Sequence, residues 1–338
     1  MAELILGMGT SHGPLLSTPP EEWDLRANVD RKNTALAYRD GTYDFATLAA
    51  MRAGEGFAAQ NAQGVRAERF ARCQKRLDEL GERAHAARPD VMVVIGDDQD
   101  EWFQPDIQPA FAIFHGKEVN NRALTTEESE NRAKIGAQYA AKLYHPPADE
   151  VYPCATGLAE RMIAQAMADQ FDVTACATQP RLTNGMVRKL GHAFGFVYRR
   201  VLGSRPVPIV PVMINTYFPP NQPTAKRCYD FGRSLGRAVE AWKSDARVAV
   251  AASGGVSHFV IDEAFDARIL KAMQTRDERA MTSEPEYMYR SGNSEIKNWI
   301  AVAGMMAETK LAMNVLDYVP CYRSEAGTGN AMAFAVWE

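Results

Sequence analysis

The chain has 338 residues, of which 46% are hydrophobic and 24% charged, and its formal net charge is −4. This mixed charge excludes the basic surface typical of nucleic-acid-binding proteins, and the length suits one large α/β domain as well as two smaller ones. No apolar run approaches the roughly 20 residues that cross a bilayer, and the Met-Ala-Glu-Leu start lacks the basic region of a secretory signal.

The five cysteines are odd in number and lie far apart along the chain. This pattern fits reduced thiols better than a disulfide framework or a zinc cluster. We therefore expect a cytoplasmic protein that acts on a small molecule, with neither nucleic acid nor membrane as a partner.

The first expected strand covers residues 4–9 and runs into Thr10-Ser-His12. Its glycine spacing imitates the beginning of a dinucleotide-binding fingerprint. However, His12 takes the place of the third glycine, and Pro14 follows where a helix should begin. The sequence therefore argues against a nucleotide site and places a histidine at the end of a strand.

Residues 20–90 precede the next strand and contain two expected helices, at 45–61 and 64–87. The second helix has Phe70, Leu77 and Leu80 at roughly helical spacing among many charges. We interpret the segment as a solvent-facing helical insertion, acting as a lid or a subunit contact, within a single domain of residues 1–338.

A near-continuous apolar run at 91–96 is typical of a strand buried on both faces, and it ends in Asp97-Asp-Gln-Asp-Glu101. Carboxylates placed directly after a buried strand are costly unless they are exposed, paired or bound to a cation. This acidic turn is therefore either a solvated loop or part of a metal site. Another short strand, at 109–114, ends in His115.

The middle of the chain alternates helices and strands. His145 precedes two prolines, which favours a surface turn, and His192 falls within an expected helix. The prolines of the 206–214 strand favour an edge or irregular position, and a loop with Tyr217 and Phe218 follows. The helices are expected at 126–144, 156–169 and 184–202, and the strands at 171–178 and 206–214.

The C-terminal third repeats the plan of the N-terminus. An apolar strand from Val248 leads through Gly254-Gly255 to Ser257-His258, so two strand ends each present Ser-His and suggest one shared site. Helices are expected at 223–242, 261–275 and 295–306, and strands at 316–321 and 331–337. The alternation predicts a three-layer α/β/α sandwich with a mixed central sheet.

Taken together, these motifs resemble the class III (LigB-type) extradiol ring-cleavage dioxygenases. The resemblance covers nearly the whole chain and is closest to 3-O-methylgallate dioxygenases. It is carried by Thr-Ser-His12, Asp-Asp-Gln99, Gly-His192, Asn215-Thr-Tyr-Phe-Pro-Pro, Ser-Gly-Gly-Val-Ser-His258 and Glu295-x-x-x-Trp. It implies a LigB-like fold and O2-dependent opening of a catecholic or pyrogallolic benzoate such as 3-O-methylgallate, gallate or protocatechuate.

The resemblance also implies an Fe(II) cofactor held by two histidines and a glutamate. His12 and Glu295 match two of these ligands, while Gln99 stands where many members have the second histidine. A glutamine oxygen is neutral like imidazole but a weaker donor, so we predict loosely bound iron with Gln99 as the third ligand. Asp97 and His115 remain alternatives for that position.

Other roles follow from the same resemblance. His258 matches the acid/base residue that takes a phenolic proton, and His192 matches a second-sphere residue that bonds a ring hydroxyl, unless it is simply a core histidine. Tyr217 and Phe218 either wall the ring or merely pack.

From chemistry and chain position, a substrate carboxylate would find donors at Arg323, Ser324, Thr328 and Asn330. We expect a homodimer in which the 20–90 segment covers the site, where some relatives use a separate small subunit.

Two other functions fit the sequence. One is a divalent-metal hydrolase or lyase on the same fold, and the other is a non-catalytic binding subunit whose metal site has decayed at Gln99. The presence of His258 and Glu295 argues against decay, because a buried carboxylate and imidazole are costly to keep without use.

Overall fold

A mixed sheet forms the centre of the computed structural model, which describes residues 1–134 and 137–338. The strand order is β11-β13-β1-β10-β4-β9-β5-β8, and β12 pairs with β13. The strands are β1 (Glu3–Thr10), β4 (Val91–Asp97), β5 (Phe111–Phe114), β8 (Thr174–Cys176), β9 (Ile209–Ile214), β10 (Arg247–Ser253), β11 (His258–Val260), β12 (Met313–Tyr322) and β13 (Thr328–Trp337). Two small ribbons pair β2 (Leu36–Tyr38) with β3 (Gly41–Tyr43) and β6 (Glu118–Asn121) with β7 (Glu150–Pro153).

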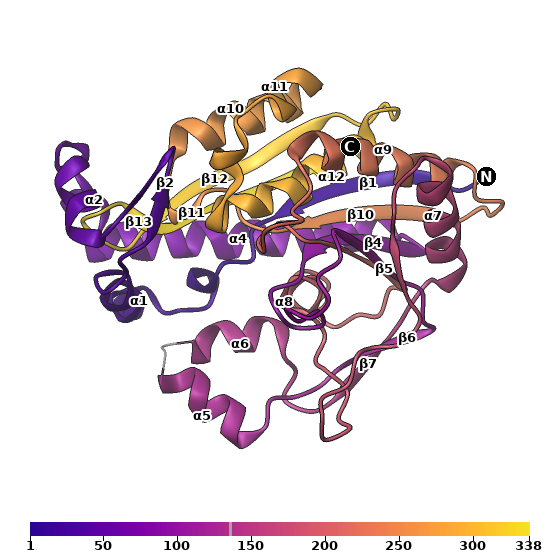
Figure 1. The fold of residues 1–338 in the computed structure, drawn as a ribbon, viewed down its shortest axis with the longest axis horizontal. Coiled ribbons are helices and arrows are strands. Elements are labelled where there is room, and N and C mark those ends of the chain that lie inside the picture. Colours follow the sequence, from indigo (N-terminus) through magenta and orange to yellow (C-terminus); the bar gives the residue numbers. More distant parts are fainter. Residues whose placement is uncertain (135–136) are drawn as a thin grey trace.

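Helices cover both faces of this sheet, as Figure 1 shows. The longer ones are α1 (Trp23–Asp30), α2 (Phe45–Met51), α4 (Gln63–Ala87), α5 (Thr126–Lys134), α6 (Gln138–Tyr144), α7 (Thr156–Ala168), α9 (Ala225–Glu240), α10 (Glu263–Gln274) and α12 (Ile296–Met306). The short ones are α3 (Phe57–Gln60), α8 (His192–Phe196) with the π-helical turn η4 (Val197–Val201), α11 (Glu278–Thr282), and the 3-10 turns η1 (Pro14–Leu16), η2 (Pro20–Glu22), η3 (Ala53–Glu55), η5 (Glu286–Tyr289) and η6 (Ser291–Glu295). The predicted three-layer α/β/α architecture with a mixed sheet is confirmed.

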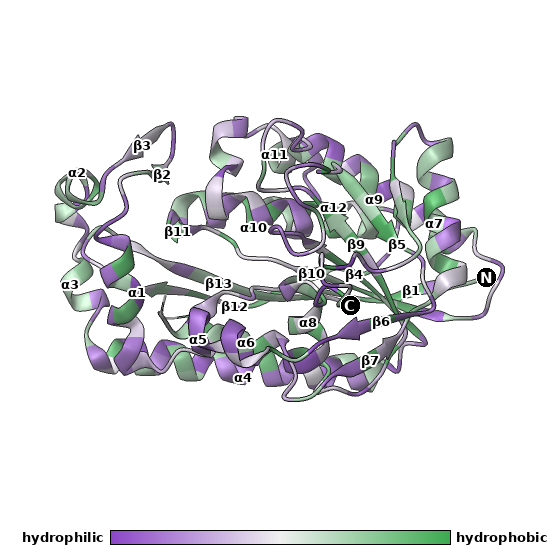
Figure 2. Ribbon diagram, turned by 60° about the horizontal axis from the view of Figure 1, so that its bottom comes forward, coloured by the Kyte–Doolittle hydropathy of each residue, from purple (hydrophilic) through white to green (hydrophobic). Residues whose placement is uncertain are grey.

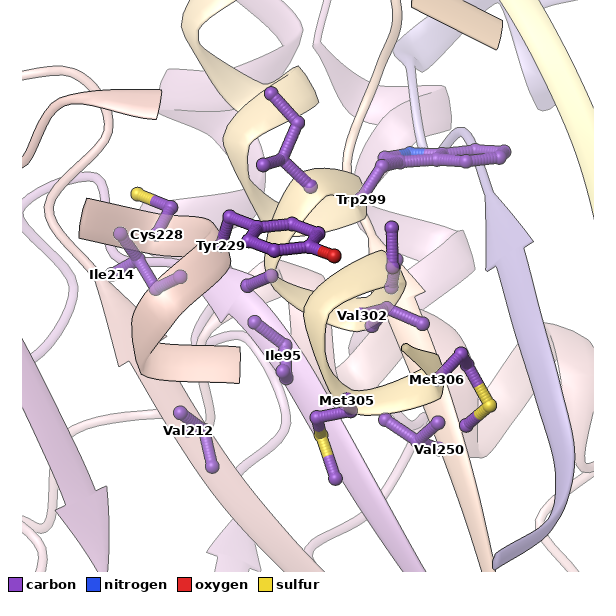
Figure 3. Close-up of a cluster of buried hydrophobic side chains, with 14 of the residues drawn as sticks. Ile95, Val212, Ile214, Cys228, Tyr229, Val250, Trp299, Val302, Met305 and Met306 are labelled. Atoms are coloured by element: carbon purple, nitrogen blue, oxygen red, sulfur yellow. The ribbon is translucent and has the colours of Figure 1, made fainter. Parts of the chain in front are cut away.

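The central strands are apolar on both sides because each face of the sheet has its own core. In β4, Val93 and Ile95 contribute to the core under α7, α9, α10 and α12, whereas Met92 and Val94 contribute to the core under α4 and α8. Figure 3 shows part of the first core, where side chains of α9 and α12 pack over the sheet. Successive side chains of a strand point to opposite faces, so a strand between two helical layers is apolar at every position.

The helix α4 belongs to one of these layers and is not a solvent-facing insertion. Its buried positions Cys73, Leu77, Leu80 and Ala84 recur every three to four residues, and this stripe packs against β1, β12 and β13. In Figure 2 its hydrophobic residues alternate with hydrophilic ones along the length. The many charges of α4 suggested exposure, yet they occupy only the outer side of an amphipathic helix. The preceding segment packs more locally, with Leu36 and Leu48 against Val260 of β11.

Two other expectations were wrong in detail. Residues 184–191 are irregular and the helix begins only at His192. The strand β9 lies in the interior of the sheet between β4 and β5. Two of its three prolines precede the strand, and the β5 pairing ends at Val212, just before Pro211 is reached.

The strands β1, β10, β4 and β9 run parallel, so their carboxyl ends lie along one edge of the sheet. In open α/β sheets this edge is where ligands bind. The strand β5 runs antiparallel to β9, which carries His115 to the opposite edge. Among the described residues, none of the helices combines the length and the apolar character needed to span a membrane.

Candidate metal centre

Side chains from distant parts of the chain meet at the carboxyl edge of the sheet. His12 follows β1, His258 follows β10, and Glu295 immediately precedes α12. The Nε2 atom of His12 lies 3.1 Å from Glu295 Oε2, and that of His258 lies 3.2 Å from Glu295 Oε1. The two Ser-His motifs therefore do share one site.

The ring of His12 is oriented by Ser253 at the end of β10. The Ser253 hydroxyl donates to the carbonyl of Ala193 at 2.7 Å and lies 3.0 Å from His12 Nδ1. Because that hydroxyl proton is already used, the Nδ1–H of His12 must be the donor. The Nε2 lone pair of His12 consequently faces Glu295.

His192 enters the same cluster from the start of α8. Its Nδ1 lies 2.9 Å from Glu101 Oε2, and its backbone N–H donates to Glu101 Oε1 at 2.7 Å. A carboxylate on Nδ1 is the usual support for a metal-binding histidine, since it fixes the ring and leaves Nε2 free. That Nε2 lies 3.2 Å from His12 Nε2, so His192 is placed as a metal-ligand candidate and not behind the ligands.

The acidic turn after β4 supplies the remaining polar groups. Asp97 is fully buried, and its Oδ2 lies 3.8 Å from His192 Nε2. The Gln99 amide nitrogen donates to Asp97 Oδ2 at 2.9 Å and to Glu295 Oε1 at 3.0 Å. Gln99 therefore lies in the cluster, bridging two carboxylates through its nitrogen.

The charges of the cluster shift one another's pKa values. Burial opposes ionisation of Glu295, but the neighbouring His258 and His12 hold its pKa well below the usual value. Burial, together with the charge of Glu295, raises the pKa of Asp97. Burial disfavours the charged ring of His192, yet Glu101 raises its pKa well above the ordinary value. Buried carboxylates and imidazoles in this proximity need a proton or a cation between them.

The donor set fits a metal ion. One ligand atom from each of His12, Asp97, His192 and Glu295 can be chosen so that all four lie within 4.8 Å of one another. Because the Nδ1 atoms of His12 and His192 are taken up by Ser253 and Glu101, the two Nε2 atoms face each other at 3.2 Å, an arrangement that needs either a shared proton or a cation between them. Two histidines and a carboxylate are the ligands typical of non-haem ferrous sites.

His258 stands beside this cluster with its own support. Its Nδ1–H donates to the Val256 carbonyl at 2.7 Å, which leaves Nε2 facing Glu295 and the cavity. Gly255 must be a glycine, because a Cβ there would lie 2.5 Å from the His258 ring. The same residue donates its N–H to Glu295 Oε2 at 2.6 Å, so the Gly-Gly turn positions both side chains.

Asp266 anchors the Ser257-His258 segment from α10. It accepts the Ser257 N–H at 2.8 Å, the Ser257 hydroxyl at 2.5 Å and the Tyr318 hydroxyl at 2.7 Å. Despite these bonds, burial raises the pKa of Asp266 from 3.8 to about 7.

This raised pKa predicts a pH-dependent stability. Because the folded pKa of Asp266 exceeds the unfolded one, its favourable contribution is complete below pH 3.8 and is lost as the pH rises through about 7. In urea unfolding at several pH values, the stability of the wild type relative to Asp266→Asn should fall between pH 5 and pH 8. A pH-independent difference would contradict the assignment.

A cavity of about 310 Å³ opens onto the cluster. Its lining includes the side chains of His12, Gln99, Glu101, His192, His258 and Glu295, together with Arg26, Arg132, Tyr144, Phe259 and Asn330. Tyr217 and Phe218 are not among the residues that line this cavity. Burial raises the pKa of Tyr217, and the charge of Glu295 adds a smaller contribution in the same direction.

The predicted carboxylate-binding loop is mostly occupied with other contacts. Arg323 binds Asp30 through two nitrogens, at 2.6 and 2.9 Å, and the hydroxyls of Ser324 and Thr328 lie 2.6 Å apart. Thr328 also donates to Asp30 at 2.5 Å. Of the four residues predicted to bind a substrate carboxylate, only Asn330 lines the cavity. Arg323 is engaged by Asp30 and therefore offers no nitrogen pair to a substrate.

Two further histidines lie elsewhere than expected. His115 is at the far edge of the sheet, where its Nδ1 lies 3.8 Å from Glu160, so it is ruled out as the third ligand. His145 is buried, with only 6% of its surface exposed, and not in a surface turn. Within the described residues neither of its ring nitrogens has a hydrogen-bond partner, and burial together with Arg132 lowers its pKa to about 3.

Comparison with known proteins shows the family of the chain. Residues 58–329 match the family described as the catalytic LigB subunit of aromatic ring-opening dioxygenase. A gallate dioxygenase of Pseudomonas putida KT2440 is 31% identical over 175 residues, which cover 47% of this chain and 48% of that enzyme. The match thus spans about half the length of the relative.

A crystal structure of the uncharacterized protein JW3007 from Escherichia coli K12 aligns over 98% of this chain and 99% of its own, with 13% identity and a TM-score of 0.44. This distant likeness carries no functional argument. The family match covers most of the chain and includes the candidate ligands Asp97, His192 and Glu295, while His12 precedes it. The chain belongs to the LigB family of aromatic ring-opening dioxygenase catalytic subunits.

Proposed function

We propose that the protein is an Fe(II)-dependent extradiol dioxygenase that opens the ring of a catecholic or pyrogallolic benzoate with O2. The observation that carries this proposal is the convergence of His12, His192 and Glu295 on one point, with His258 beside it at the wall of the cavity. The similarity to a gallate dioxygenase supports gallate as a substrate to test, and the family resemblance of the sequence motifs adds 3-O-methylgallate and protocatechuate.

In this proposal the metal ion is held by His12, His192 and Glu295, with Asp97 within reach. When bound by these residues, ferrous iron would supply coordination of a diphenol and of O2. The protein's own contribution is to fix these ligands: Ser253 and Glu101 set the histidine tautomers, and Gly255 orients the Glu295 carboxylate.

His258 acts on the substrate and not on the metal. Its Nδ1 proton is committed to the Val256 carbonyl, so its Nε2 is the atom that can accept a proton from a phenolic hydroxyl in the cavity. A base at this position converts the neutral diphenol into the phenolate form that binds a cation, and it can return the proton later in the reaction.

Anaerobic reconstitution with ferrous iron, followed by oxygen-uptake measurements on gallate, 3-O-methylgallate and protocatechuate, tests the function. We expect one O2 consumed per ring opened. Absence of uptake on every diphenol, together with full occupancy by zinc, would instead favour a divalent-metal hydrolase or lyase. A cytoplasmic homodimer remains our prediction for the assembly, with the site covered in cis by the 20–90 segment, now through the part of it that precedes α4.

The identity of the third ligand is decided by two variants. Because the Gln99 nitrogen is committed to two carboxylates whereas His192 presents a free Nε2, His192→Ala should weaken ferrous binding at least ~100-fold, beyond the 10- to 100-fold typical of residues that only support a ligand.

Gln99→Leu should weaken the same affinity by only about tenfold, the lower end of that supporting range. Anaerobic titration with ferrous iron measures both variants. The reverse ranking would restore Gln99 as the ligand and return His192 to a supporting role.

A further inference from the structure

Arg26 is an arginine at the cavity wall whose guanidinium forms no ion pair with any described residue. It lies on α1 and lines the same cavity as His12, His258 and Glu295. Its Nε is buried and has no hydrogen-bond partner, and within residues 1–134 and 137–338 no carboxylate forms an ion pair with its guanidinium. The side chain as a whole is half-buried, but a buried donor nitrogen without an acceptor is costly, and an acceptor group on a ligand would satisfy it.

The charges around Arg26 favour the binding of an anion at this position. Asp30, on the same helix, is bound by Arg323 through two nitrogens and is therefore already neutralised. Burial and the charge of Arg323 lower the pKa of Arg26, Tyr144 and Asp30 offset only part of this shift, and Arg132 adds to the lowering. Arg26 thus stands in a positive environment that a bound anion would relieve.

Arg132 is the second cation of this wall. It lies on α5, lines the same cavity, and donates from Nη1 to the Tyr144 hydroxyl at 3.2 Å. Among the described residues no carboxylate pairs with it either, whereas the neighbouring Arg122 and Lys189 are both paired with Glu128. Two guanidinium groups therefore line one cavity, and in the described part of the chain neither forms an ion pair with a carboxylate.

The acids of the cavity cannot fill this need. Glu101 is bonded to the ring and the backbone of His192, and Glu295 is bonded to Gly255 and faces two histidines. The side chains of Pro14, Ala140 and Phe259 supply an apolar surface between these polar groups. The cavity thus offers metal donors, a surface for a ring, and two arginines in need of an anion.

We infer that Arg26, assisted by Arg132, binds the carboxylate of the aromatic substrate and thereby selects diphenols that carry a carboxylate over the same diphenols without one. This inference rests on the proposed ring-cleavage function. A guanidinium matches the planar geometry of a carboxylate and can bind it through two nitrogens. Arg26 is then a specificity-determining residue from a segment that precedes the family match.

Two substrate pairs test the inference, namely protocatechuate against catechol and gallate against pyrogallol. Arg26→Gln should raise the KM for the carboxylated member roughly 10- to 100-fold, the loss expected for a charge-assisted bond, and leave kcat nearly unchanged. The KM for catechol or pyrogallol should stay within about twofold, since no carboxylate is present to be lost. Arg26→Lys should restore part of the preference.

Arg31→Gln is the matched control, because Arg31 adjoins the same helix but is exposed and pairs with Glu325 outside the cavity. It should leave both KM values as in the wild type. Equal thermal unfolding midpoints for Arg26→Gln and Arg31→Gln would exclude a folding defect as the cause.

A second measurement needs no turnover. Metal-free wild-type protein, titrated calorimetrically with 4-hydroxybenzoate and with phenol, should bind the carboxylate and not the phenol, and Arg26→Gln should lose that binding. If the wild type cleaves diphenols but Arg26→Gln affects both members of a pair equally, the inference falls while the proposed function stands. If no diphenol is cleaved, the function falls, and the metal-free titration alone decides whether Arg26 binds a carboxylate.

Discussion

Glu295→Gln should abolish stable ferrous binding and, with it, ring cleavage. Glu295 is 2% exposed, and its two oxygens face His12, His258, Gln99 and the N–H of Gly255. Glutamine keeps the shape but loses the charge, and its amide nitrogen must point at one of the donors that the carboxylate now accepts. We expect at least a ~100-fold loss of affinity, more than the 10- to 100-fold typical of groups that only support a ligand.

Iron content after anaerobic reconstitution and desalting measures this effect directly. Glu308→Gln is the control, since Glu308 is exposed just beyond α12 and pairs with Arg233 away from the site. It should retain iron as the wild type does. A Glu295→Gln protein that holds one iron per chain would remove Glu295 from the ligand set.

His258→Gln should separate chemistry from metal binding. The His258 side chain reaches the cavity with Nε2 toward Glu295, but it is not one of the four residues whose donor atoms cluster together. Loss of a positioned general base typically costs roughly 10²- to 10⁴-fold in rate, so kcat should fall by this factor while ferrous affinity stays near the wild-type value.

Steady-state oxygen uptake and a ferrous titration on the same preparation test both halves of this prediction. His85→Gln, on α4 and away from the site, should match the wild type in both. If His258→Gln lost iron as severely as Glu295→Gln, His258 would have to be counted among the ligands.

The sequence was most informative where a motif and a strand end coincide. The runs before His12, Asp97 and His258 are so apolar that each predicts a buried strand, and parallel neighbours must bring their carboxyl ends to one edge. This reasoning alone predicts that these three residues lie close together. The addition of Glu295 to the same site came from the family resemblance. The same reasoning fails for His115, because the residues of β5 do not reveal that this strand runs antiparallel to β9.

The roles of His192 and Arg26 could not be derived in this way. His192 is held by Glu101, 91 positions earlier, whose carboxylate also accepts the backbone N–H of this first helical residue, and local periodicity misplaced the helix start. Arg26 lies in a polar segment that contains no recognisable motif. Its proposed role depends on the ion pair between Arg323 and Asp30, which leaves Arg26 without that carboxylate as a partner. The roles of His192 and Arg26 both depend on contacts between residues far apart in the sequence, which local sequence patterns do not predict.

The position of β1 in the sheet has a consequence for how the protein is made. This first strand pairs with β10 and β13, whose residues are synthesised more than two hundred positions later. During translation the apolar side chains of Leu4, Leu6 and Met8 lack these two partner strands until the strands are made, and transiently exposed apolar surface of this kind favours aggregation. A site that needs both His12 and Glu295 is consequently assembled only after position 295 has been synthesised, because these two residues lie 283 positions apart.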